Sequence, residues 1–125
     1  MRSKKSLVVV VLAAFLAAGL SLAIQAEDEG EKMTVQGEIL DMACYVGHGA
    51  KGAEHAKCAK TCVKGGQPMG LLAKDGTVYL LYASHEEGTP FQEAKEFAGQ
   101  QVELSGVMAT KAGIKGIEVR AVKAL

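Results

Sequence analysis

The chain lacks tryptophan and is poor in the other aromatic residues, with three Phe and three Tyr among 125 residues. It therefore offers no aromatic platform of the kind on which single-stranded bases stack. It also lacks an excess of charge of either sign, because 14 basic side chains balance 14 acidic ones. A protein without a basic excess has no electrostatic footprint for nucleic acid, and we expect none as a partner.

Several catalytic and cofactor motifs are also absent from the sequence. The chain has no Cys-x-x-Cys redox pair, no Cys-x-x-Cys-His motif for covalent haem and no visible Ser-His-Asp arrangement. The glycine-rich stretch 65–70 lacks the Lys-Ser/Thr of a phosphate-binding loop. Since no acid–base constellation can be recognised, the sequence favours a binding protein over an enzyme.

The N-terminal segment 1–26 has the composition of a secretion signal. Three basic residues within the first five positions precede an uncharged apolar run (7–20), and a more polar stretch ends at Ala26. This order predicts a signal peptide cleaved after Ala26, and hence a periplasmic or secreted protein. The alternative is a retained membrane anchor, because the uncharged stretch is close to the roughly 20 residues that span a bilayer. The acidic residues that follow at once (27–31) favour cleavage.

Cleavage would leave residues 27–125. We divide them into a flexible acidic N-terminus (27–32) and a single domain (33–125), since about a hundred residues can form one modest core but not two. Three of the 14 basic side chains and none of the 14 acidic ones lie before residue 27, which leaves 11 against 14 and a net charge of −3.

Alternating apolar and polar residues predict five short strands, at 34–40, 71–74, 77–82, 101–108 and 117–121. Asp75-Gly76 predicts a tight hairpin with positive φ at both central residues, and Lys111-Ala112-Gly113 predicts a second turn.

A helix is expected from Thr89 to Ala98, between the third and fourth strands. Thr89 would be its N-cap, Pro90 its first residue and Gln92 the partner in a capping box, and Gly99 would end it. Five strands with a helix in this place follow the order of the OB-fold. We therefore predict a mainly β protein, an OB-fold-like five-stranded β-barrel with a Cys/His-bearing helical insertion between strands 1 and 2. A different small barrel or an α+β roll would give a similar pattern.

The inserted connection, residues 41–70, holds all three cysteines and two of the three histidines. Residues 53–63 favour a helix that ends before Gly65-Gly66. On that helix His55, Cys58 and Cys62 are spaced i, i+3 and i+7 and share one face. Cys44, at the end of the first strand, could fold back onto this face.

One imidazole and three thiolates form the ligand set of a tetrahedral zinc site, and they also suit Cu(I). We predict a metal ion, zinc or copper, as the cofactor and partner, with four ligands: Cys44, His55, Cys58 and Cys62. His48 is a substitute ligand, and Asp41 could orient a ligating histidine from outside the coordination sphere. Another periplasmic protein is a further candidate partner, and a membrane is one only if the N-terminal segment is retained.

Two other interpretations remain open. In the first, Cys44 forms a structural disulfide with Cys58 or Cys62, as is usual in exported proteins, and the domain is an adaptor or ligand-binding module with one spare thiol. In the second, the odd cysteine is a redox thiol whose thiolate is stabilised by the nearby lysines Lys57, Lys60 and Lys64.

Three segments of the chain resemble a group of small exported bacterial proteins that has no secure activity. They are Gly37–Tyr45, His55–Cys62 and Gly66–Leu72, and they match the pattern D-x-x-C, H-x-x-C-A-x-x-C and G-x-P-x-G. The resemblance covers roughly residues 34–82 and includes every predicted ligand. It supports the position of the site and implies no particular activity.

Overall fold

The computed structural model describes residues 30–125. The predicted signal segment 1–26 and the first residues of the predicted acidic N-terminus lie outside the described residues. The described chain contains the following elements, in order: β1 (Glu31–Asp41), α2 (Met42–His48), η1 (Ala53–His55), α3 (Ala56–Lys64), β2 (Met69–Ala73), β3 (Val78–Tyr82), α4 (Thr89–Ala94), η2 (Lys95–Phe97), β4 (Gln101–Lys111) and β5 (Ile114–Ala124).

The five strands close into a barrel in the order β1-β2-β3-β5-β4. Neighbouring strands are antiparallel, except that β3 and β5 run parallel where Leu80–Tyr82 pairs with Gly116–Glu118. The short helix pair α4 and η2 connects β3 to β4, and the cysteine-bearing insertion connects β1 to β2. The predicted OB-like barrel is confirmed in strand number, strand order and the place of both helical connections.

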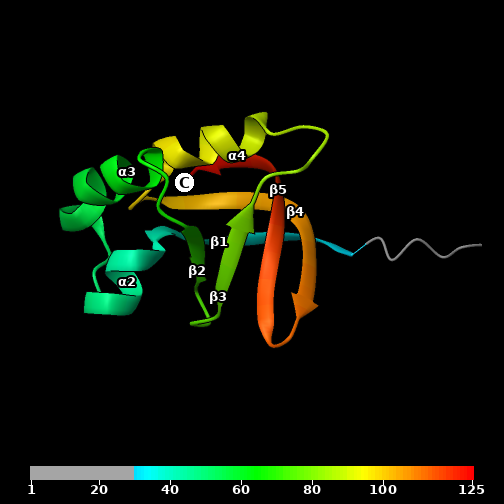
Figure 1. The fold of residues 1–125 in the computed structure, drawn as a ribbon, viewed down its shortest axis with the longest axis horizontal. Helices are drawn as coiled ribbons and strands as arrows, with labels where there is room; N and C mark the ends of the chain where they lie inside the picture. Colours follow the sequence, from blue (N-terminus) through cyan, green and yellow to red (C-terminus); the bar gives the residue numbers. More distant parts are fainter. Residues whose placement is uncertain (1–29) are drawn as a thin grey trace, which may run out of the picture.

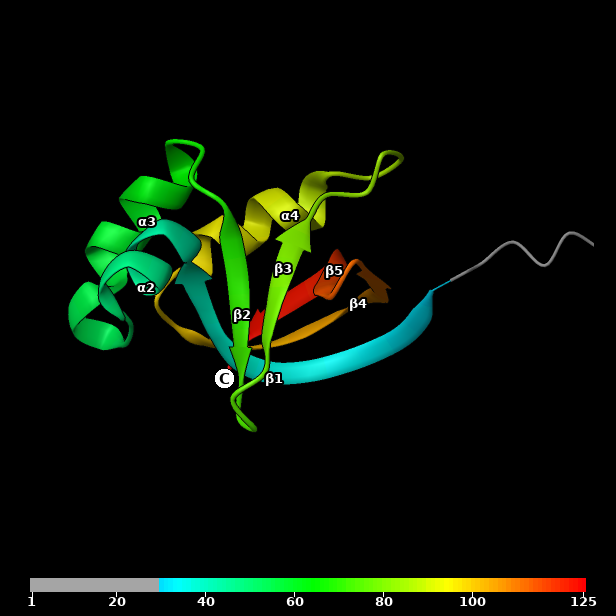
Figure 2. The ribbon, with the colours of Figure 1, turned by 60° about the horizontal axis from the view of Figure 1, so that its bottom comes forward.

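The insertion lies at one end of the barrel. Figures 1 and 2 show α2 and α3 side by side where β1 ends, while the start of β1 lies at the opposite end of the molecule. α3 is anchored in the common core, because Ala59 and Val63 are fully buried among the barrel side chains. Full burial of a side chain such as Val63 stabilises the fold by about 1.5–3 kcal/mol. The insertion is therefore a packed part of the domain.

Two turns differ from expectation in their detail. At the β2–β3 hairpin only Gly76 has positive φ (87°), and the Asp75 carboxylate accepts the Thr77 N–H, so the predicted type with two positive φ values is wrong there. That type occurs instead between β4 and β5, where Ala112 (φ 51°) and Gly113 (φ 82°) both adopt the left-handed conformation. Two-residue hairpin turns of the type that fits the twist of the strands need positive φ at both turn residues. The β4–β5 hairpin meets this need with an alanine, a residue for which positive φ is unfavourable.

The predicted capping box of α4 is also wrong. The N-cap is Gly88, so Thr89 is the first helical residue and no side chain caps the helix. Instead, the Thr89 N–H donates a hydrogen bond to Oε1 of Glu87, with an N···O distance of 2.8 Å. The predicted end of the helix is correct: the chain leaves η2 through Gly99, whose φ is 79°. A side chain at Gly99 would collide with the backbone of Ala56, so this glycine also lets the start of α3 approach the segment after η2 closely.

Candidate metal centre

Asp41 ends β1 and starts α2, which was not predicted. Its Oδ1 accepts hydrogen bonds from the backbone N–H groups of Ala43 (2.9 Å) and Cys44 (3.4 Å), the arrangement of an N-cap. Gly49, with φ 68°, closes the helix after His48. Cys44 therefore stands in the first turn of a helix rather than at the end of a strand. The sequence contains the capping residues that predict this helix: Asp41 at its start and Gly49 after its last residue.

A second side chain that the sequence analysis missed, Glu38, fixes the start of the other helix. Glu38 is only 7% exposed, and its Oε1 accepts the N–H of Gly52. The carbonyl of the same glycine accepts the N–H of His55 at 3.0 Å. This chain of bonds ties η1, and with it His55, to the barrel wall. A glutamate at a buried position of a strand indicates that its side chain has a polar partner. The sequence could not identify this partner, because it is the backbone N–H of a loop glycine.

α2 and α3 bring the sulfur atoms of all three cysteines together. The Sγ atoms of Cys44, Cys58 and Cys62 lie within 4.8 Å of one another, and all three residues are free thiols. A second set is formed by a carboxylate oxygen of Asp41, the Sγ of Cys44 and a ring nitrogen of His55, again within 4.8 Å of one another. Cys44 belongs to both sets. The four predicted ligand residues thus gather at one place, as two overlapping sets rather than one group of four.

The two accessory positions differ in the structure. Asp41 lies inside the cluster as a potential donor, instead of only behind a ligating histidine. His48 lies exposed at the end of α2 and belongs to neither set. The structure therefore offers His48 as a matched control for His55.

Two polar atoms of the cluster are buried without a hydrogen-bond partner among residues 30–125. They are Oδ2 of Asp41, a residue that is 1% exposed, and Nε2 of His55. A buried polar group left without a partner costs about 1–3 kcal/mol, and a charged one costs more. Both residues belong to the set that includes Cys44, so one ion held by this set could be a partner of both side chains.

The pKa shifts in the cluster favour a negative charge on the Asp41 carboxylate over negative charges on the Cys44 and Cys62 thiols. Burial acts to raise the pKa of Asp41, but interactions with the Cys44 thiol and with the backbone N–H groups of Cys44 and Ala43 outweigh it and leave that pKa below its usual value. The Asp41 carboxylate raises the pKa of Cys44 to about 11, with help from burial and from the other two thiols. Burial, followed by Asp41 and Cys58, raises the pKa of Cys62. The raised pKa values favour the protonated thiol at Cys44 and Cys62 when no cation is bound.

Two lysines of α3 pair with a carboxylate: Lys60 and Lys64 both form ion pairs with Glu96 of η2. The redox interpretation relied on lysines of this helix to stabilise a thiolate, and these two are engaged with Glu96 instead. The cluster opens to solvent on the side of Cys58, which is exposed, whereas Cys44 and Cys62 are half-buried.

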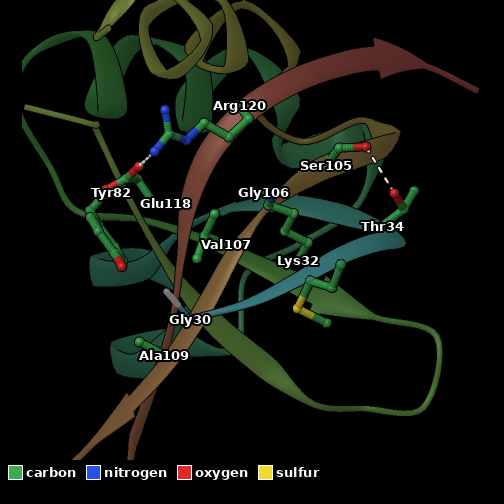
Figure 3. A pocket seen from close by; sticks show the side chains of 11 residues that line it. Gly30, Lys32, Thr34, Tyr82, Ser105, Gly106, Val107, Ala109, Glu118 and Arg120 are labelled. Carbon is green, nitrogen blue, oxygen red and sulfur yellow. Dashed lines mark hydrogen bonds and ion pairs between the residues drawn. The ribbon is translucent and has the colours of Figure 1, made fainter. Parts of the chain in front are cut away.

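A hollow without cysteines lies at the other end of β1. It is an open cleft of about 810 Å³ beside the first residues of β1 and the middle of β4 and β5. Figure 3 shows that its polar side chains largely face one another: the hydroxyls of Thr34 and Ser105 are 2.9 Å apart, and Arg120 pairs with Glu118. No Cys or His lines this cleft.

Comparisons with protein-family models, with curated proteins and with solved structures find no match for this chain. Within residues 30–125, none of the helices has the length and apolar character needed to cross a membrane.

Proposed function

We propose that this chain is an exported domain that binds a soft or borderline transition metal, zinc or copper, through Cys44, Cys58 and Cys62 together with His55 and Asp41. One observation carries the proposal. Three thiols from two helices converge within 4.8 Å next to two buried polar atoms that have no hydrogen-bond partner among residues 30–125.

The donor chemistry suits these metals. Thiolate sulfur is polarisable and anionic, which favours Cu(I) and zinc, and imidazole and carboxylate are common additional ligands of zinc. In a tetrahedral site with metal–sulfur bonds of about 2.3 Å, the sulfur atoms are about 3.8 Å apart. The observed limit of 4.8 Å is within a small side-chain adjustment of that spacing. A bound cation would also favour the thiolate form of its cysteine ligands, because the ion's charge lowers the pKa of a coordinating thiol.

The exposure of the cluster favours an exchangeable ion over a purely structural one. A structural zinc site is closed to solvent, with four protein ligands. Here Cys58 is exposed, and the barrel core is formed without the cluster by the side chains of strands, α3 and α4. Storage, delivery or sensing of the metal fits this arrangement better than a role in holding the fold together.

Export is part of the proposal, and the sequence of residues 1–26 supports it. Unpaired cysteines at such short range would tend to oxidise in the compartment that the signal predicts. A bound metal is the simplest reason for three of them to be retained. The raised pKa values of Cys44 and Cys62 weigh against the redox interpretation, since a reactive thiol needs a lowered pKa.

The disulfide interpretation is the main rival, because the sulfur of Cys44 lies within reach of both other cysteines. The test is the metal content of the chain purified from the periplasm without a polyhistidine tag, for the wild type, Cys62→Ser and His48→Gln. Metal binding predicts at least one zinc or copper ion per chain in the wild type and in His48→Gln, and fewer ions than in the wild type in Cys62→Ser. If all three proteins contain only background metal and the wild type has one free thiol, the proposal is wrong and the cysteines are structural.

A further inference from the structure

We propose that the cluster holds two metal ions that share the thiolate of Cys44. One ion would be bound by Cys44, Cys58 and Cys62, and the other by Asp41, Cys44 and His55. This inference rests on the proposed function and deepens it, because it assigns two adjacent sites of different ligand chemistry to what the sequence presents as one.

The grouping of the donor atoms is the first argument. Donors of one ion surround it at about 2.0–2.4 Å, so every pair of them is separated by less than about 4.8 Å. The five donors of the cluster do not form one such group. They form two, and each contains three residues with Cys44 as the common member. A thiolate has lone pairs for two metals, so one sulfur can serve both sets.

The unpartnered buried atoms are the second and independent argument. An ion bound only by the three thiols would leave Asp41 Oδ2 and His55 Nε2 without a partner, as they are in the described structure. Asp41 is 99% buried, and its second oxygen Oδ1 is already used by the backbone of α2. Oδ1 is therefore engaged by the helix, Oδ2 has no partner among residues 30–125, and a carboxylate oxygen of Asp41 lies within 4.8 Å of Cys44 Sγ and of a ring nitrogen of His55. A second ion in this set satisfies both atoms.

Charge balance is the third argument. Three thiolates and one carboxylate carry four negative charges, and two divalent ions neutralise them. None of the ion pairs among residues 30–125 includes Asp41, and Lys60 and Lys64 are engaged with Glu96. A single divalent ion with the same donors ionised would leave a charge of −2 in a half-buried place, which is unfavourable.

The two sets differ in softness. Three thiolates form the softer set, which suits Cu(I) or zinc, whereas the carboxylate, imidazole and single thiolate form a borderline set that suits zinc. Each set supplies three protein donors, so each ion keeps one position for water or for a donor from an incoming molecule. The exposed Cys58 places the softer set nearer to solvent.

The test is a zinc titration of the exported chain, stripped with a chelator and kept reduced, with bound zinc counted by native mass spectrometry. We expect two zinc ions per wild-type chain. His55→Gln and Asp41→Asn should each retain one ion, with an affinity for it within about threefold of that of the tighter wild-type site. Asp41→Asn keeps an oxygen for the helix cap, so its effect separates ligation from folding. His48→Gln is the matched control and should bind two.

One zinc ion per wild-type chain at saturation would overturn the two-ion inference, whether or not His55→Gln removes that ion, and would leave the proposed function intact. No zinc and no copper in the wild type would overturn both.

Discussion

Two carboxylates near opposite ends of β1 illustrate why the cluster differs from the rest of the molecule. Glu118 lies in the open cleft and forms an ion pair with Arg120, which neutralises its charge (Figure 3). Its Oε1 makes no further hydrogen bond. Asp41, at the helical end, is more deeply buried, its Oδ2 has no hydrogen-bond partner, and no Lys or Arg among residues 30–125 pairs with it. The first carboxylate has a cationic partner, whereas the second has none among these residues. The helical end is therefore the better candidate for a cation site.

The largest expected effect is the loss of metal in Cys44→Ser. Cys44 belongs to both ligand sets, so its removal damages every donor group at once. Because loss of a group that only orients a ligand costs 10–100-fold in affinity, we expect loss of this ligand to cost more than about 100-fold. Competition with a chromogenic chelator measures the change. Cys58→Ser, which alters only one set, should weaken binding less, and equal effects of the two variants would contradict the shared role of Cys44.

The second prediction tests the two carboxylates against each other by thermal unfolding. At a free zinc concentration about 100 times the dissociation constant, binding stabilises the wild type by about 2.7 kcal/mol. In a domain of this size that amounts to an increase in Tm on the order of 10 °C. Glu118→Gln should keep the full increase, whereas Asp41→Asn should keep only the part that comes from its one remaining ion. A reduced response to zinc in Glu118→Gln would mean that the cleft, and not only the helical end, takes part in binding.

The third prediction concerns Glu38, which connects the barrel wall to the loop before His55. Glu38→Ala leaves the Gly52 N–H without its partner, and we expect a loss of about 1–3 kcal/mol in the free energy of unfolding. Zinc affinity should fall as well, because His55 is no longer held. Glu54→Ala, an exposed change next to His55, is the control and should alter stability by less than about 0.5 kcal/mol. Unchanged unfolding of Glu38→Ala in urea would show that the bond is unimportant.

The smallest effect is expected at the β4–β5 hairpin, away from the cluster. Ala112 has positive φ, which costs an alanine about 1 kcal/mol. Ala112→Gly should therefore stabilise the domain by about 0.5–1 kcal/mol and leave zinc affinity unchanged. Ala109→Gly, in the adjoining strand, should instead destabilise it by a similar amount. If both variants destabilise the domain, the strain at Ala112 is not real.

Much of the fold could be predicted because it depends on local patterns. Alternating residues located the five strands, and the run of helix formers before Gly65 located α3. Details that depend on neighbouring elements could not be predicted. Whether Thr89 or Gly88 caps α4, and which hairpin takes two positive φ values, depends on how the chain enters and leaves each element in three dimensions.

The site was predictable in its residues and not in its geometry. The spacing of His55, Cys58 and Cys62 follows from helical periodicity alone. The division into two sets depends on α2, a short helix that exists because Asp41 caps it and that turns Cys44 toward α3. The role of Glu38 depends on a backbone partner 14 residues away, which no side-chain pattern encodes.

The central claim is that the cluster binds metal, and the most direct measurement is the number of alkylatable thiols before and after chelation. It is made by intact-mass spectrometry on the chain purified from the periplasm, together with its metal content. The account predicts bound zinc or copper, few reactive thiols before chelation and three after it. A chain that contains no metal and has one reactive thiol both before and after chelation would contradict the account.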